Sequence, residues 1–118
     1  MSNHANTVCP HFHKAIELIG RRWTGAVLQV LMKGRTRYCD IRDAIPEVSD
    51  RMLSERLKEL ESEGIVVRVV MLNIPVRVEY ELSAKGRALE HVLGAVSKWA
   101  EAWKEVGPAQ PKARASRA

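Results

Sequence analysis

The segment spanning residues 37–64 constrains the fold of this chain more than any other part of the sequence. Pro46 divides the segment, because the residue before a proline is disfavoured in the helical region. After this break, Ser49 is a predicted helix N-cap and Gly64 a predicted C-cap. The apolar positions between the caps recur at the i, i+4, i+7 spacing of one buried helix face: Leu53, Leu57 and Leu60. The segment therefore predicts a short helix over residues 38–44, a tight connection, and a longer amphipathic helix. The spacing of the short helix predicts that it buries Tyr38, Ile41 and Ile45.

Two further helices are predicted before this segment. The first begins at Pro10, which suits the first helical position because no N–H is needed there, and it ends near Gly20. Its apolar residues share one face: Phe12, Ala15, Ile16 and Ile19. The second helix, over residues 24–33, is apolar almost all round, which is typical of a helix buried at the centre of a domain. Residues 35–37 are too few for a helix and are predicted to form a small edge strand.

After Gly64 the apolar pattern changes to a period of two. Residues 65–72 and 76–82 are rich in β-branched side chains and flank a short turn, which predicts a hairpin. In the second run the apolar residues that we expect to face the core alternate with charged ones: Val76, Val78, Tyr80 and Leu82. Ser83 is then predicted to cap a last helix that continues to about Val106.

These elements predict one domain over residues 9–106, mainly α with a small β-hairpin (an α+β fold). Residues 1–8 are polar and are expected to be a flexible N-terminus. Residues 107–118 begin with Gly107-Pro108, carry three basic residues and are expected to form a disordered basic tail.

Charge and composition limit the classes of protein to which this chain can belong. The chain has a net charge of +5 and a pI of 9.6, and residues 1–58 hold ten Lys or Arg against six Asp or Glu. This distribution suggests an acidic partner. No apolar run is long enough to cross a membrane, and the N-terminus lacks the apolar core of a signal peptide. Two cysteines do not make a secreted disulfide framework, so we expect a cytoplasmic protein without a membrane partner.

The order of the predicted elements is that of a winged helix-turn-helix. Several strings of the sequence are diagnostic in combination: CP near the start, LIGRRW, LMKGRTRYCDIRDAIPEVSDRMLSERLKELESEGIV, PVRVEYELSAKG and a late Trp. Together they resemble the HxlR family of bacterial winged helix-turn-helix regulators over residues 9–103. Within that family the chain is most similar to the YodB-type branch, whose members sense quinones, electrophiles or disulfide stress through an N-terminal cysteine. The resemblance implies a regulator that binds an inverted-repeat operator as a homodimer paired through its N- and C-terminal helices, and we expect it to be associated with the nucleoid. Repression is the default expectation, because a small DNA-binding dimer acts most simply by blocking polymerase.

A helix-turn-helix places its second helix in the major groove, with its N-terminal residues facing the base edges. The residues that we expect to contact double-stranded DNA are Arg37, Ser49, Arg51, Met52, Ser54, Glu55, Lys58 and Arg77. Arg51 can donate to O6 and N7 of guanine, and Glu55 can accept from N4 of cytosine, although Glu55 can instead pair with Arg51 on its own helix. Arg77 lies beside the hairpin turn, where it is expected to contact a phosphate or the minor groove. The alternative for each residue is an ordinary solvated side chain.

The last helix carries an apolar stripe that is large for a chain of this size. Exposed apolar patches mark interaction surfaces, so we expect the stripe and the first helix to form a dimer interface. The expected interface residues are Phe12, Ile16, Leu89, Val92, Val96, Trp99 and Trp103. The alternative is that the stripe packs on its own domain.

Cys9 lies where the first helix is predicted to begin, with His11, His13 and Lys14 close by in sequence. Helix N-termini and nearby cations favour the reactive thiolate. The resemblance implies that Cys9 is the sensing residue, whereas composition alone favours an inert N-cap residue. Some members of the branch carry further cysteines near the C-terminus, but this chain has only Cys39 besides Cys9. The open possibilities are a Cys9–Cys39 disulfide across subunits, a Cys9–Cys9 disulfide, a mixed disulfide with a small thiol, and alkylation by a quinone or another electrophile.

Two other interpretations of the sequence remain open, and a third, an enzyme, is not expected. Four potential ligands cluster near the N-terminus: His4, Cys9, His11 and His13. Their spacing matches no closed zinc motif, so no metal and no other cofactor is expected, although a metal- or small-ligand-responsive regulator is an alternative to thiol switching. A winged helix used only for protein interaction is a second alternative, against which the basic residues argue. No phosphate-binding loop, carboxylate pair or CxxC motif is present, so we expect no enzyme.

Overall fold

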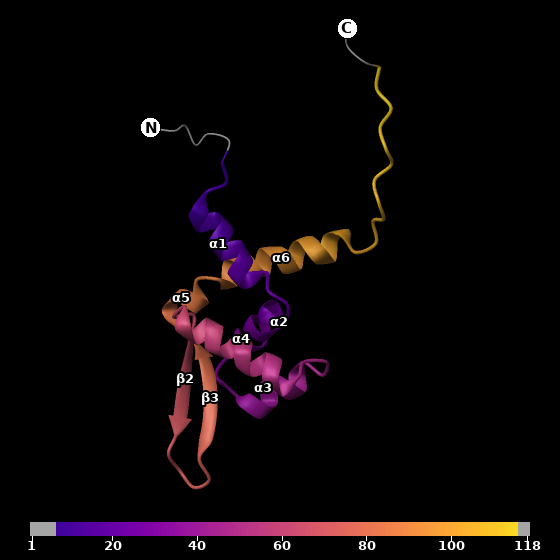
Figure 1. Cartoon of the computed structure of the whole chain (residues 1–118). Helices are drawn as coiled ribbons and strands as arrows, with labels where there is room; N and C mark the ends of the chain where they lie inside the picture. Colours follow the sequence, from indigo (N-terminus) through magenta and orange to yellow (C-terminus); the bar gives the residue numbers. More distant parts are fainter. Residues whose placement is uncertain (1–6, 116–118) are drawn as a thin grey trace, which may run out of the picture.

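A computed structural model describes residues 7–115 of the chain (Figure 1). Most of the predicted flexible N-terminus, including His4, and the last three residues of the predicted tail lie outside the described residues. The helices and strands follow in the order α1 (Pro10–Ile19), α2 (Thr24–Leu31), β1 (Thr36–Arg37), α3 (Tyr38–Ala44), α4 (Asp50–Ser62), β2 (Val66–Met71), β3 (Arg77–Leu82), α5 (Ala84–Arg87) and α6 (Glu90–Trp103). Residues 107–115 are exposed and belong to no helix or strand. The predicted fold class, mainly α with a small hairpin, is confirmed.

The hydrophobic core lies between α2, α3, α4 and the sheet. The fully buried apolar residues of α2 and α4 are Val27, Leu28, Leu31, Leu53, Leu57 and Leu60. They are the residues whose spacing predicted a central helix and an amphipathic helix. Ile41 of α3 and Val66, Tyr80 and Leu82 of the sheet complete this core. The helix-turn-helix segment and the hairpin are therefore fixed to one another through shared apolar contacts.

The three strands form an antiparallel sheet in the order β1-β3-β2. The hairpin pairs from Val66 with Leu82 to Met71 with Arg77, and β1 reaches only as far as the pair of Arg37 with Glu79. The expected alternation places Tyr80 and Leu82 in the core. Val76 was also expected on the buried face, but it is 63% exposed because it lies in the turn beyond the last paired residues.

The predicted continuous helix from Ser83 to Val106 is wrong. It is two helices, α5 and α6, separated by a turn at Ala88 and Leu89. In this turn the N–H of Leu89 donates to the carbonyl of Gly86, three residues back, instead of four. The Ser83 hydroxyl donates to the carbonyl of Gly64 and accepts from the N–H of Gly86, so α5 is fastened to the start of the hairpin. α6 ends at Trp103, and α2 likewise ends at Leu31, before the expected Lys33.

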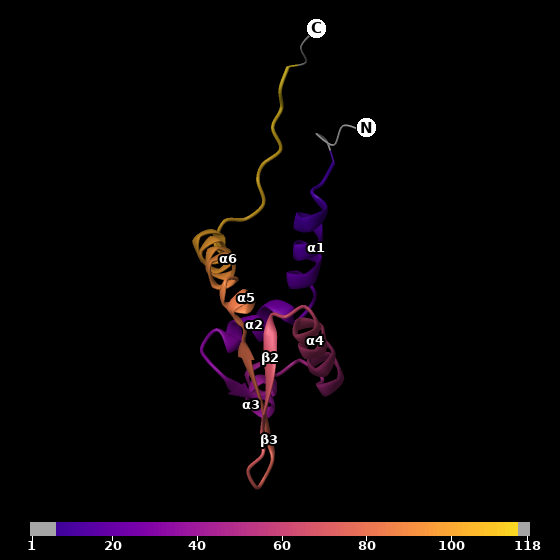
Figure 2. The same cartoon turned by 90° about the vertical axis from the view of Figure 1, so that its left-hand side faces the viewer.

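Helices α1 and α6 lie at one end of the molecule and the hairpin projects from the other (Figures 1 and 2). Neither α1 nor α6 contains a buried residue. Both ends of the described chain emerge on the side of α1 and α6, away from α3, α4 and the hairpin. The helix-turn-helix surface and the terminal helices are therefore spatially separate.

Candidate nucleic-acid interface

The connection between α3 and α4 is short and anchored at two points. Ile45 and Val48 are both buried, and the N–H of Val48 donates to the carbonyl of Ile45. Pro46 and Glu47, between them, are exposed. This arrangement turns the chain tightly while the two apolar anchors fix the angle of α4 relative to α3.

The first turn of α4 is held by side chains from α3. The Ser49 hydroxyl accepts a hydrogen bond from the N–H of Met52 at 3.1 Å, so the predicted N-cap is present. The Tyr38 hydroxyl lies 3.2 Å from the backbone oxygen and Oδ1 of Asp50 and 3.2 Å from Oγ of Ser54. Nη1 of Arg42 lies 3.5 Å from Oδ1 of Asp50, whose charge and hydrogen bond raise the pKa of the Arg42 guanidinium above its ordinary value.

No sequence pattern predicted these contacts of Tyr38 and Arg42. Tyr38 was assigned to the core on its spacing, and it does pack against the core, but its hydroxyl reaches the start of the next helix. Asp50 in the first turn of α4 was a usable signal, because a carboxylate at that position can accept hydrogen bonds from hydroxyl and guanidinium groups of the preceding helix. The N-terminal turn of α4, which a helix-turn-helix presents to base edges, is thus rigidly oriented.

The exposed face of α4 carries the predicted polar residues. The Arg51 side chain is 88% exposed, and its Nε lies 3.3 Å from Oε1 of Glu55. Lys58 is exposed two turns further along the helix on the same face. Ser54 is exposed and shares its hydroxyl with Tyr38. Met52 differs from the others, since its side chain is half-buried and packs against the core.

The outer half of the hairpin, near the turn, brings Arg77 close to Arg37 of β1. Both line one shallow recess of about 230 Å³ with Cys39. Arg37 pairs opposite Glu79 in the sheet, and Arg77 lies two residues nearer the tip on the same face. Among residues 7–115 neither arginine forms an ion pair, because Glu79 is held by Arg35 at 3.5 Å. Both guanidinium groups therefore remain available to an anionic partner.

Arg56 is a residue that sequence reasoning missed. Its side chain is only 12% exposed, and its Nε donates to the carbonyl of Arg22 at 2.9 Å. Its Nη1 lies 3.2 Å from both carboxylate oxygens of Glu59, and Nη1 of Arg21 reaches the same carboxylate at 2.9 Å. These bonds join the middle of α4 to the link between α1 and α2. The only sequence signal was the i, i+3 spacing of Arg56 and Glu59.

The two cysteines are free thiols in different regions. Cys9 is exposed at the N-cap of α1, and its side chain makes no cap hydrogen bond. Cys39 is half-buried in α3, and α1 and α3 lie at opposite ends of the molecule (Figures 1 and 2). A bridge needs Cα atoms within about 7 Å, so the arrangement disfavours a disulfide between them in one chain. No group of three His, Cys, Asp or Glu side chains among residues 7–115 is arranged to hold a metal ion.

The predicted interface residues of α1 and α6 are exposed in the single chain. Trp99 is 67% exposed, and the other large apolar residues with substantial exposure on these helices are Phe12, Ile16, Val92, Val96 and Trp103. Leu89 differs, because it is half-buried and packs against the core. Apart from Leu89, the stripe does not pack on its own domain.

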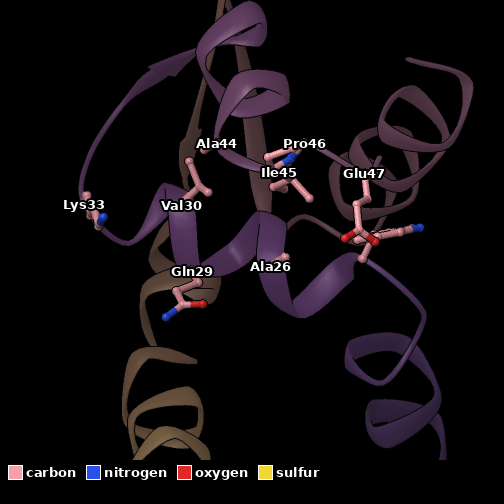
Figure 3. A pocket seen from close by; sticks show the side chains of 9 residues that line it. Ala26, Gln29, Val30, Lys33, Ala44, Ile45, Pro46 and Glu47 are labelled. Atoms are coloured by element: carbon pink, nitrogen blue, oxygen red, sulfur yellow. The ribbon is translucent and has the colours of Figure 1, made fainter. Parts of the chain in front are cut away.

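A recess of about 390 Å³ lies between α2 and the connection of the helix-turn-helix (Figure 3). Ala26 and Val30 of α2 form one side, and Ile45 and Pro46 of the connection form the other. Trp23, Gln29, Lys33, Ala44 and Glu47 complete the lining. Its volume lies within the range of small-molecule pockets.

Comparison with known proteins identifies the family. Residues 18–108 match the family model described as HxlR-like helix-turn-helix. The chain belongs to the HxlR family. Its relatives are named as transcriptional regulators, so this HxlR-family protein is a transcriptional regulator of the helix-turn-helix type and, as expected, not an enzyme.

Two relatives from Bacillus subtilis (strain 168) are especially similar. The HTH-type transcriptional regulator YvaP is 48% identical over 96 residues, which cover 81% of this chain and 89% of YvaP. The HTH-type transcriptional regulator YodB is 45% identical over 102 residues, covering 86% of this chain and 91% of YodB.

Solved structures of HxlR-type regulators resemble the fold closely. The reduced form of YodB matches with a TM-score of 0.76 and 43% identity, over 86% of this chain and 100% of that chain. The oxidised redox regulator HypR matches with a TM-score of 0.75 and 35% identity, over 80% and 96% of the two chains. None of the helices described for this HxlR-family protein has the length and apolarity needed to span a membrane.

Proposed function

We propose that this protein is a repressor that binds an inverted-repeat operator as a homodimer. The observation that carries the proposal is the exposed face of α4, where Arg51 and Lys58 lie on a helix whose first turn is fixed by Tyr38. Such a helix fits the major groove, where Arg51 can donate to both acceptors of a guanine. Arg37 and Arg77, beside this helix, suit contacts with phosphate, which position a protein on DNA without selecting sequence.

The exposed apolar stripe supports pairing of two copies through α1 and α6. An apolar patch of this kind on a small domain is typical of an interaction surface. A two-fold axis at this end of the molecule directs both α4 helices toward DNA, where half-sites lie about 34 Å apart. A small dimer that covers an operator represses most simply by blocking polymerase. We place it in the bacterial cytoplasm, at the nucleoid.

A salt series of gel shifts with the DNA upstream of the gene tests this proposal. We expect Arg77→Ala to weaken binding to all sequences and to reduce the salt slope by about 1. Arg51→Ala is expected to relax base preference at one half-site position, at a cost of about 1–3 kcal/mol. Arg87→Ala, in which an exposed arginine of α5 is lost, is the matched control and should leave binding unchanged. Binding that is absent or insensitive to salt would favour a protein-interaction module.

We further propose that modification of Cys9 releases the operator. Support comes from its exposure at the start of α1, a helix of the proposed dimer interface, where a bulky adduct or a disulfide would displace the helix. YodB has been solved in diamide-treated and quinone-bound forms, and HypR in oxidised and reduced forms. Those findings concern YodB and HypR, but they favour an oxidant, a quinone or another electrophile as the effector here.

The test treats the DNA-bound protein with diamide or a quinone. We expect release from the wild type and from Cys39→Ser, but not from Cys9→Ser. Loss of release in Cys39→Ser as well would indicate a Cys9–Cys39 disulfide across subunits. Release from Cys9→Ser would eliminate the thiol switch.

The recess beside the helix-turn-helix favours a second candidate, regulation by a small ligand without thiol chemistry. A molecule bound between Ala26 and Ile45 would bear directly on the connection that sets the angle of α4. Such an effector should release DNA from Cys9→Ser but not from Ala26→Leu, whose larger side chain fills the recess.

A further inference from the structure

The turn of the hairpin, residues 72–76, has an unusual surface for the most projecting part of the molecule (Figures 1 and 2). We call these five residues the wing tip. Their sequence is Leu-Asn-Ile-Pro-Val, and their large apolar side chains are exposed: Leu72 by 83%, Ile74 by 100% and Val76 by 63%. Single exposed apolar residues are ordinary, but three within five residues at one point indicate a contact surface.

The surroundings of the wing tip favour an anionic partner. Residues 64–78 contain two arginines and no acidic residue, and the first acid beyond them, Glu79, is paired with Arg35 at 3.5 Å. β1 covers the hairpin only as far as the pair of Arg37 with Glu79, so the outer pairs and the wing tip stand free. The apolar tip thus continues directly from the surface that carries Arg37 and Arg77.

We propose that the wing tip inserts Ile74 and its apolar neighbours into the minor groove beside each half-site and bends the operator. This inference rests on the proposed function, since it assigns a second mode of contact to the same DNA complex. Apolar side chains such as Ile, Leu and Pro act in other proteins as wedges between base steps, which they partly unstack.

The dimensions of the hairpin restrict how the wing tip can engage DNA. The minor groove is about 6 Å wide. Two paired strands are already about 4.8 Å apart between their backbones, so with side chains the ribbon is too wide to enter. Only side chains that protrude from the turn can reach the base edges, and Ile74 is the most exposed of them. Entry of a branched side chain widens the groove and kinks the duplex away from it.

Insertion of Ile74 predicts that the operator has a base preference at positions that α4 does not contact. Kinking is least unfavourable at flexible pyrimidine–purine steps such as TA and CA. The operator should therefore prefer such a step at the position of the wing tip. Because Ile74 carries no charge, its contribution should not depend on salt, whereas that of Arg77 should.

The experiment uses the full-length protein and the upstream DNA fragment that it shifts. Affinity is measured over a salt series, and bending by the mobility of circularly permuted fragments. Ile74→Ala is expected to weaken binding roughly tenfold, the effect of losing part of one buried apolar side chain, with an unchanged salt slope and a smaller bend. Val67→Ala is the matched control, since Val67 is 44% exposed on β2 away from the turn, and it should bind and bend like the wild type.

Thermal unfolding of Ile74→Ala should match the wild type, because the side chain is fully exposed and makes no packing contact to lose. Wild-type affinity and bending in Ile74→Ala, alongside weaker binding by Arg77→Ala, would overturn the wedge and leave the proposed function intact. A change in self-association of Ile74→Ala without DNA, at unchanged affinity, would also overturn it and indicate a contact between copies. If the wild type shifts no fragment, both proposals fail.

Discussion

Arg56 offers a sharp test of how α4 is held in place. Its guanidinium bonds to the carbonyl of Arg22 at 2.9 Å and to the carboxylate of Glu59 at 3.2 Å, and its side chain is 12% exposed. Arg56→Ala removes both bonds. It leaves the apolar face of α4 unchanged, because that face is formed by the leucines of the helix. The substitution therefore isolates the polar connection between α4 and the link that joins α1 to α2.

The expected loss follows from the burial of the group. Hydrogen bonds that involve a charged group contribute roughly 1.5–3 kcal/mol, and low exposure limits screening by water. Arg21 still contacts Glu59 at 2.9 Å in the variant, so the carboxylate keeps one partner. We therefore expect Arg56→Ala to lower the free energy of unfolding by about 2 kcal/mol. With a urea m-value of about 1.5 kcal/mol/M, the unfolding midpoint should fall by about 1.3 M.

The assay is urea unfolding at one fixed protomer concentration, because association shifts apparent stability. Arg51→Ala is the matched control, since Arg51 lies on the same helix and also pairs with a glutamate, but its side chain is 88% exposed. An exposed pair of this kind contributes no more than about 0.5 kcal/mol. Arg56→Lys keeps the charge but not the planar fork, so its midpoint should lie between those of Arg56→Ala and the wild type. Equal midpoints for Arg56→Ala and Arg51→Ala would refute the reasoning.

Three further predictions concern the cap, the helix break and the proposed dimer. Ser49→Ala should lower the free energy of unfolding by about 1 kcal/mol in urea titrations, because the first turn of α4 loses its side-chain acceptor; no change would contradict the cap. Gly86→Ala should be markedly less stable than Gly25→Ala in thermal melts, since a Cβ at Gly86 would collide with the carbonyl oxygen of Ile65 whereas that at Gly25 meets nothing within 4 Å. Trp99→Asp should sediment as a monomer at concentrations where the wild type is a dimer, and identical sedimentation would argue against the α6 interface.

Most of the local structure was predictable because it depends on residues close together in sequence. The bounds of α3, the cap at Ser49 and the leucine repeat of α4 follow from spacing and from Pro46, and the structure confirms them. The hairpin follows from the change to a period of two at Gly64. Of the candidate DNA-contact residues, the exposure of Arg51 and Lys58 on one helix face was equally predictable from the positions of the buried leucines.

Other features depend on neighbours that are distant in sequence. Arg51 and Arg56 each precede a glutamate by one helical turn, yet only the Arg56 side chain is largely covered, because it packs against the link between α1 and α2 and donates to the carbonyl of Arg22. The hydroxyl of Tyr38 reaches the next helix, although its spacing indicated only a core residue. The side chain of Met52 is turned partly into the core.

The sequence by itself determined the elements, their caps and their buried faces, since each of these is set within a few turns of chain. Only the tertiary structure decided that the last helix breaks after Arg87, since the close approach of Ile65 to Gly86 fixes α5 against the hairpin. It also decided that the stripe containing Trp99 lies at the opposite end from α3 and the wing tip. The physical reason is that the direction of a helix, and what covers its apolar face, depend on packing between segments that local propensity does not encode.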